Sequence, residues 1–133
     1  KKLNRFADIR QRNFETLNSF FSSQKFFKLP KQLPQVKTSW LAFPLTITSK
    51  APFSRIEIVK HLESHGIQTR PVFTGNVLRQ PAFEKINYKN IEKEYDVANN
   101  IMKNSFLIGC NHGLNEKHLE KIKTTFQLFL DKF

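Results

Sequence analysis

The apolar residues at both ends of the chain recur at intervals of three and four positions. Because an α-helix has about 3.6 residues per turn, this spacing gathers them on one side of a helix, where they can be buried together. The two stripes predict long amphipathic helices over residues 3–21 and from Asn115 to Phe133. The first stripe consists of Leu3, Phe6, Ala7, Phe14, Leu17 and Phe21, and the second of Leu119, Ile122, Phe126, Phe129, Leu130 and Phe133.

Three stretches between these helices favour β-strands. Residues 39–48 are aromatic and β-branched, residues 67–73 follow a glycine, and residues 101–109 contain a third strand. Pro44 has no amide hydrogen to give to a neighbouring strand, so it predicts that the first strand lies at an edge or contains a bulge.

A further helix is bounded by clear signals. Ser54 and Glu57 form the pattern of a capping box, and Gly66 stands where a helix turns left-handed and ends. Residues 77–83 favour a short helix, whereas residues 84–100 are polar and irregular with a helical end.

The predicted order is helix, strand, helix, strand, strand, helix, which is typical of an α/β (α+β) fold. We expect a small sheet of about three strands covered by helices, with both terminal helices on the same face. A length of 133 residues fits one domain. Within it, residues 1–37 form an amphipathic helix and a basic, proline-containing connector, and residues 38–133 form the α/β core. The first residue is not methionine, so we expect a piece of a longer protein.

Charge favours some classes of function and disfavours others. The net charge is +11, which is common among nucleic-acid-binding proteins, but residues 1–37 carry nine Lys and Arg against only two Asp and Glu. The phenylalanines follow buried stripes rather than alternating with these cations, so a nucleic-acid module is the weaker hypothesis. No apolar run approaches the roughly 20 residues of a membrane helix. The single cysteine, Cys110, excludes an internal disulfide and favours the cytoplasm.

Two groups of residues carry possible chemistry without forming a complete site. His61 and His65 lie four apart and could share a metal ion, but no third ligand is near them in the sequence, so two solvated histidines are the simpler reading. Cys110 and His112 could act as nucleophile and base, although such pairs normally come from distant segments. We therefore predict no metal site and no catalytic residue in this chain.

The segment from Thr69 to Phe83 has the composition of a ligand-binding loop. It leaves a predicted strand, bends at a glycine and offers several hydrogen-bonding side chains. An ordinary polar turn with one structural arginine is the alternative. The candidate substrate-binding residues are Arg70, Thr74, Gly75, Asn76, Arg79 and Gln80.

Four segments together resemble a known family. They are residues 40–46, residues 66–83, residues 101–109 and the pair Gly113-Leu114. In this order they resemble the C-terminal domain of the sugar aminotransferase/dehydratase superfamily, and within it the CDP-4-keto-6-deoxyglucose 3-dehydratases of lipopolysaccharide biosynthesis. The chain departs from that pattern at Asn111 and His112, where such proteins tend to have an aromatic residue and a proline.

The resemblance implies the small domain of a fold-type-I enzyme, normally a homodimer, whose large N-terminal domain holds pyridoxamine or pyridoxal 5'-phosphate. The substrate would be a nucleotide-linked 4-keto-6-deoxyhexose, with residues 69–83 lining its cleft. The absent part leaves room for a [2Fe–2S] cluster, and a reductase partner is compatible with it. A nucleotide-sugar aminotransferase is the near alternative, and the 133-residue chain alone should be inactive.

Overall fold

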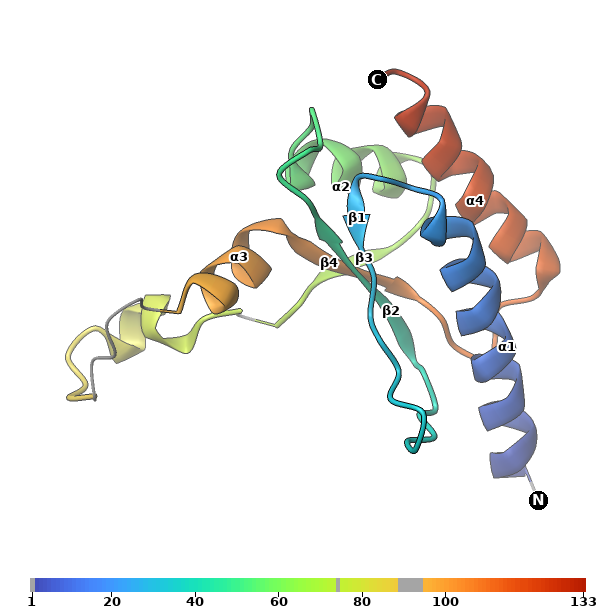
Figure 1. Cartoon of the computed structure of the whole chain (residues 1–133), viewed down its shortest axis with the longest axis horizontal. Helices are drawn as coiled ribbons and strands as arrows, with labels where there is room; N and C mark the ends of the chain where they lie inside the picture. Colours follow the sequence, from blue (N-terminus) through green and yellow to red (C-terminus); the bar gives the residue numbers. More distant parts are fainter. Residues whose placement is uncertain (1, 74, 89–94) are drawn as a thin grey trace.

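The computed structural model describes residues 2–73, 75–88 and 95–133 (Figure 1). Its elements, in chain order, are α1 (Lys2–Ser22), β1 (Phe27–Lys28), β2 (Ala42–Ile47), α2 (Arg55–Ser64), β3 (Thr69–Pro71), the 3-10 turns η1 (Val77–Arg79) and η2 (Pro81–Phe83), α3 (Asp96–Asn104), β4 (Ser105–Gly109) and α4 (Glu116–Leu130).

The described strands form one antiparallel sheet in the order β1-β2-β4-β3. This confirms the α+β prediction, with one strand more than the three expected. The additional strand, β1, lies in the basic segment that the sequence presents as a connector. It forms because Phe26 and Phe27 are buried, which brings residues 27 and 28 alongside β2.

Pro44 lies in an inner strand rather than at an edge or in a bulge. Its strand, β2, pairs with β4 on one side and with β1 on the other, but β1 pairs only with Thr46 and Ile47. Continuing that register by two residues would place Pro30 opposite Pro44. Since neither proline has an amide hydrogen, the β1–β2 ladder ends there and the missing donor costs little.

The hydrophobic core lies between one face of the sheet and the helices α1, α2 and α4. Phe21 of α1 stacks on Phe43 of β2 with ring centroids 5.5 Å apart, and Phe126 of α4 meets Phe21 edge-on at 4.7 Å. Figure 1 shows α1 and α4 side by side, so the prediction that both terminal helices cover one face is confirmed. The core is aromatic because the phenylalanine stripes of both helices face the same strands.

Both predicted caps occur. Glu57 accepts from the Ser54 amide (2.7 Å) at the start of α2, and Asn115 accepts from the His118 amide (3.1 Å) at the start of α4. Gly66 ends α2 with a φ of +74°, a conformation that costs glycine little. The last helix ends at Leu130, three residues earlier than predicted.

Each of the three predicted stretches contains a strand, and each strand is shorter than its stretch. Of residues 39–48, only Ala42–Ile47 form β2. The stretch predicted over residues 67–73 is extended only as β3, Thr69–Pro71. Residues 101–104 belong to α3, so the third predicted strand begins only at Ser105. The reason is spacing: apolar residues at positions 97, 98, 101 and 102 recur at threes and fours, which suits a helix.

Within the described residues, only α3 lies over the second face of the sheet, and it covers only one end of that face. Ala42, Pro44 and Thr46 of β2 and Leu107 of β4 point to this face and are half-buried. We call it the open sheet face. Residues 75–88 and 95–104, which contain η1, η2 and α3, project from its edge, away from α1 and α4 (Figure 1). We call these residues the arm.

Candidate functional site

The structure places the predicted site residues at the base of the arm and on β3. Gly75, Asn76, Arg79 and Gln80 lie in the arm, at or beside η1. Arg70 lies on β3 opposite Leu107, so it belongs to the open sheet face. Thr74 lies outside the described residues.

A small hydrogen-bonded network fixes the base of the arm. Asn76, only 5% exposed, donates through Nδ2 to Asn99 Oδ1 (2.9 Å) and accepts the Leu78 amide at Oδ1 (3.0 Å). Arg79 donates through Nε to the same Asn99 oxygen (3.3 Å). We call these three side chains, Asn76, Arg79 and Asn99, the asparagine clasp. It ties η1 to α3 and holds the Arg79 guanidinium by one edge.

Within the described residues, the terminal nitrogens of Arg79 have no partner, and its side chain is exposed. A guanidinium presents two parallel N–H groups that match a phosphate or carboxylate. Since Nε is already bonded to Asn99, the donors that Arg79 can offer to a ligand are those of its two terminal nitrogens. The geometry therefore suits the binding of an anion by Arg79.

Gly75 allows η1 and α3 to meet. Its φ is +70°, and a Cβ at this position would overlap Cα and Cβ of Met102 and lie 2.7 Å from the Met102 amide nitrogen. Only a residue without a side chain fits both constraints. Gly75 therefore acts by shape, and a ligand-binding role for it stays a prediction.

Arg70 has a different environment from the clasp. It donates to the Thr69 carbonyl oxygen (3.0 Å), and the Gln68 side-chain oxygen, oriented to accept, lies 2.7 Å from Nη2. It borders a hollow of about 370 Å³ between α2 and β3 that Arg55 and Glu63 also line. The predicted site residues thus form two groups, and part of the Arg70 guanidinium braces its own strand.

Asn99 is the site residue that sequence reasoning missed. It lies in the segment predicted to be polar and irregular, 23 positions after Asn76. A single asparagine among polar neighbours carries no local signal, so only the folded arm reveals its role. Gln80 ends η1 through its amide, which donates to the Val77 carbonyl (3.0 Å).

The Cys110–His112 pair is not arranged for nucleophilic catalysis. Cys110 is buried, and burial raises the pKa of its thiol to about 12, which keeps it protonated. The His112 ring contacts α1: it stacks on Phe6 with centroids 3.9 Å apart, and its Nδ1 lies 3.2 Å from Arg10 Nη2. Both residues serve the contact between α1 and the loop after β4.

The two histidines of α2 have structural contacts rather than solvent alone. His61 Nε2 lies 3.1 Å from the Thr125 carbonyl oxygen, and His65 Nδ1 lies 2.7 Å from the His61 carbonyl oxygen. In the described part of the chain, no three His, Cys, Asp or Glu side chains come together to hold a metal ion. Nor does any helix described here have the length and hydropathy to cross a bilayer.

Comparison with known proteins identifies the fold. Residues 1–127 match the model of the DegT/DnrJ/EryC1/StrS aminotransferase family. The chain belongs to this family. It is 32% identical over 130 residues to the lipopolysaccharide biosynthesis protein RfbH of Salmonella typhimurium, a match covering 97% of the chain and 30% of that protein. It is 31% identical over 128 residues to the GDP-4-keto-6-deoxy-D-mannose 3-dehydratase of Yersinia pseudotuberculosis, covering 96% and 31%.

Solved structures of two enzymes share this fold. The Escherichia coli GDP-4-keto-6-deoxy-D-mannose-3-dehydratase with bound hydrated PLP superimposes with a TM-score of 0.82 at 26% identity, over 94% of this chain and 32% of that one. An aminotransferase from Psychrobacter cryohalolentis gives a TM-score of 0.84 at 14% identity, over 99% and 36%, which shows the fold alone. The chain thus spans about a third of these family members, and the sequence resemblance is confirmed.

Proposed function

We propose that this chain is the C-terminal small domain of a pyridoxamine- or pyridoxal-phosphate-dependent nucleotide-sugar 3-dehydratase of deoxysugar biosynthesis, with lipopolysaccharide O-antigen as the product pathway. In this proposal the enzyme is a cytoplasmic homodimer, and its substrate is a nucleotide-linked 4-keto-6-deoxyhexose. The observation that carries the proposal is the match of nearly the whole chain, at 30–32% identity, to three proteins of which two are named 3-dehydratases.

The domain contributes one wall of the sugar-nucleotide cleft. The arm presents Arg79, whose two terminal nitrogens have no partner among the described residues, and Arg70 lies on the adjoining open sheet face. Nucleotide sugars carry a diphosphate, and a charge-assisted hydrogen bond from an arginine to such an anion contributes about 1.5–3 kcal/mol. Asn76 and Asn99 orient Arg79, while Thr74, Gly75 and Gln80 are proposed to complete the wall.

The described residues do not fit the cofactor itself. A pyridoxal phosphate site gathers amide or hydroxyl donors around the phosphate, but the Leu78 amide at the start of η1 already donates to Asn76, and η1 has only three residues. In our proposal the cofactor is held by the rest of the polypeptide. An iron–sulfur cluster would also need ligands from outside this chain, whose single cysteine is buried.

A nucleotide-sugar aminotransferase remains the second candidate, since two solved aminotransferases, from Brucella abortus and Psychrobacter cryohalolentis, share the fold. The residue at the cofactor position of the longer polypeptide separates the two: the resemblance implies a histidine for a dehydratase and a lysine for an aminotransferase. A nucleic-acid-binding role has less support, because most phenylalanine rings are buried in the core and cannot stack on bases.

The test is binding and turnover of a nucleotide-linked 4-keto-6-deoxyhexose by the full-length protein. Arg79→Ala should weaken substrate binding by roughly 10- to 150-fold, and Arg79→Lys should recover only part of this loss because lysine lacks the planar fork. Lys85→Ala, which removes an exposed cation from the same arm, is the matched control and should change binding less than threefold. Equal effects of Arg79→Ala and Lys85→Ala would contradict the assignment.

A further inference from the structure

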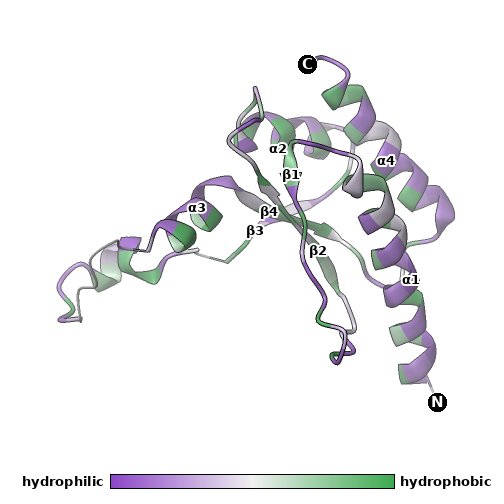
Figure 2. Cartoon of the chain, viewed as in Figure 1, coloured by the Kyte–Doolittle hydropathy of each residue, from purple (hydrophilic) through white to green (hydrophobic). Residues whose placement is uncertain are grey.

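The arm contributes no side chain to the hydrophobic core. The buried apolar residues of the described chain run as far as Ile67 and resume only at Phe106. Large apolar side chains of the arm are instead exposed, with Val97 at 74%, and Phe73 beside the arm is 89% exposed. Figure 2 shows hydrophobic stretches, coloured green, along the projecting arm. The other exposed apolar residues of the arm are Val77, Phe83, Ile86 and Tyr88.

The arm has regular secondary structure but does not pack into the hydrophobic core. It consists of two single 3-10 turns and a nine-residue helix, lengths that are not stable in water without tertiary burial. Its described contacts are the asparagine clasp, the close backbone approach of Gly75 to Met102 and the contact of α3 with β2 and β4, and none of its apolar side chains is fully buried by them. The apolar side chains of such a projecting segment are buried only when another protein segment or domain packs over them.

The open sheet face continues this surface. The helix α3 lies over one end of that face, and a hollow of about 180 Å³ between them is lined mostly by apolar groups. Its lining includes Leu29, Pro30, Pro44, Val97 and Ile101. A single partner could therefore contact the arm and the sheet at once, beside Arg70 and Arg79.

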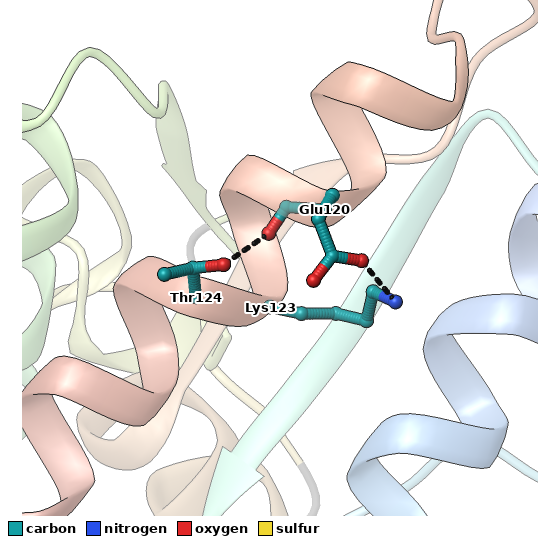
Figure 3. A network of polar contacts seen from close by, with 3 residues as sticks. All are labelled: Glu120, Lys123 and Thr124. Carbon is teal, nitrogen blue, oxygen red and sulfur yellow. Dashed lines mark hydrogen bonds and ion pairs between the residues drawn. The ribbon is translucent and has the colours of Figure 1, made fainter.

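The opposite side of the domain is a solvent surface. On α4, the Glu120 carboxylate forms an ion pair with Lys123 (Figure 3). The backbone carbonyl oxygen of Glu120 accepts a hydrogen bond from Thr124 Oγ1 at 2.9 Å. The side chains there find polar partners within their own helix. Leu128, 54% exposed, is a single apolar residue on that helix, which is ordinary for a protein surface.

We propose that the arm and the open sheet face together are the surface on which the remainder of the same polypeptide packs. The inference rests on the proposed function, because the family members matched are about three times longer than this chain. A second copy of this domain fits less well, because a two-fold contact through this surface would gather Arg70, Arg79 and Lys28 of both copies in one interface, in a chain of net charge +11.

The experiment is hydroxyl-radical footprinting of the full-length protein and of the 133-residue chain. We expect the modification rates of Phe73, Phe83 and Tyr88 to fall at least about fivefold in the full-length protein, since rates follow side-chain exposure. Phe133 and Leu128 on the helical side should change less than twofold. Val97→Glu in the full-length protein should restore modification of the arm, because a carboxylate is costly to bury. Leu128→Glu, the matched control, should not.

Each outcome has a fixed meaning. Arm rates that are equal in both proteins, or an equal response to Val97→Glu and Leu128→Glu, overturn the proposal. Protection that appears in the 133-residue chain alone and disappears on dilution identifies a second copy as the occupant, which also overturns it. If the arm is protected and Val97→Glu exposes it, the surface is confirmed even where the full-length protein fails to turn over a nucleotide sugar. In that case the proposed function fails while the docking surface stands.

Discussion

Replacing Gly75 by alanine should open the arm and leave the core intact. The substitution acts twice: alanine at a φ of +70° is strained, and its Cβ overlaps the backbone of Met102 in α3. The obstructing atoms belong to a helix backbone and not to the end of a flexible side chain, so no rotamer change relieves the contact. The helix α3 must move, and the hydrogen bonds of Asn99 to Asn76 and Arg79 are then lost.

The magnitude follows from these parts. A left-handed conformation costs an alanine about 1–2 kcal/mol, and each of the two hydrogen bonds contributes about 0.5–1.5 kcal/mol. Together they give about 2–5 kcal/mol against the closed arm. Gly66 is the matched control, because its φ of +74° carries the same strain, whereas an added Cβ there meets only Lys121 Nζ at an acceptable 3.4 Å. Gly66→Ala should therefore cost about 1–2 kcal/mol, and it should act on the core.

Amide hydrogen exchange distinguishes the two effects. Gly75→Ala should speed exchange of the Leu78 and Asn99 amides by roughly 30-fold or more, up to the limit set by the arm's own stability. The Ile108 amide in β4 should be unaffected. Gly66→Ala should speed exchange of the Ile108 amide. The ratio of the arm exchange rates to the Ile108 exchange rate should then stay the same or fall. Unchanged exchange at Asn99 in Gly75→Ala, or an equal change at Ile108, would refute the reasoning.

Three further outcomes are expected. Asn99→Ala in the full-length protein should raise KM for the nucleotide sugar more than it lowers kcat, while Asn4→Ala, at an exposed asparagine of α1 far from the arm, should leave both parameters unchanged; steady-state kinetics checks this. Cys110, whose pKa burial raises to about 12, should resist iodoacetamide at pH 8 in the native chain and react in urea, as followed by mass spectrometry. Burial lowers the pKa of His61 below its ordinary 6.5, so the unfolded state binds the proton more readily than the folded state. The urea concentration at the midpoint of unfolding should therefore fall as the pH drops from about 7.5 to 5.5. His61→Gln should make this midpoint less dependent on pH.

The helical layer was predictable because its residues are buried in one regular period. Phe14, Leu17 and Phe21 are in the core, as their spacing indicates, and so are Ile122 and Phe126 of the last helix. The strand β1 was not predictable, because two residues carry no periodicity. Its position depends on a tertiary contact, the burial of Phe26 and Phe27 against residues far along the chain.

The candidate site was only partly predictable for a related reason. Asn76 and Arg79 stand in a motif that the family resemblance highlights. Their common partner, Asn99, lies in a segment whose apolar spacing indicates a helix but not which polar side chain of that helix faces η1. The separation of Arg70 from the clasp also depends on the fold. The short strand β3 places Arg70 on the open sheet face, and the chain then turns away into the arm.

The position of the clasp links substrate binding to assembly in our proposal. The core residues are buried against one another, whereas Arg79 is oriented by Asn99 on a segment that fully buries none of its own apolar side chains. Such a segment samples open conformations readily until a partner covers it. If the remainder of the polypeptide supplies that cover, Arg79 reaches its binding geometry only in the assembled enzyme. An isolated domain should then bind the nucleotide sugar weakly even with every binding residue present, and Val97→Glu, which touches no substrate, should raise KM in the full-length enzyme as Asn99→Ala does.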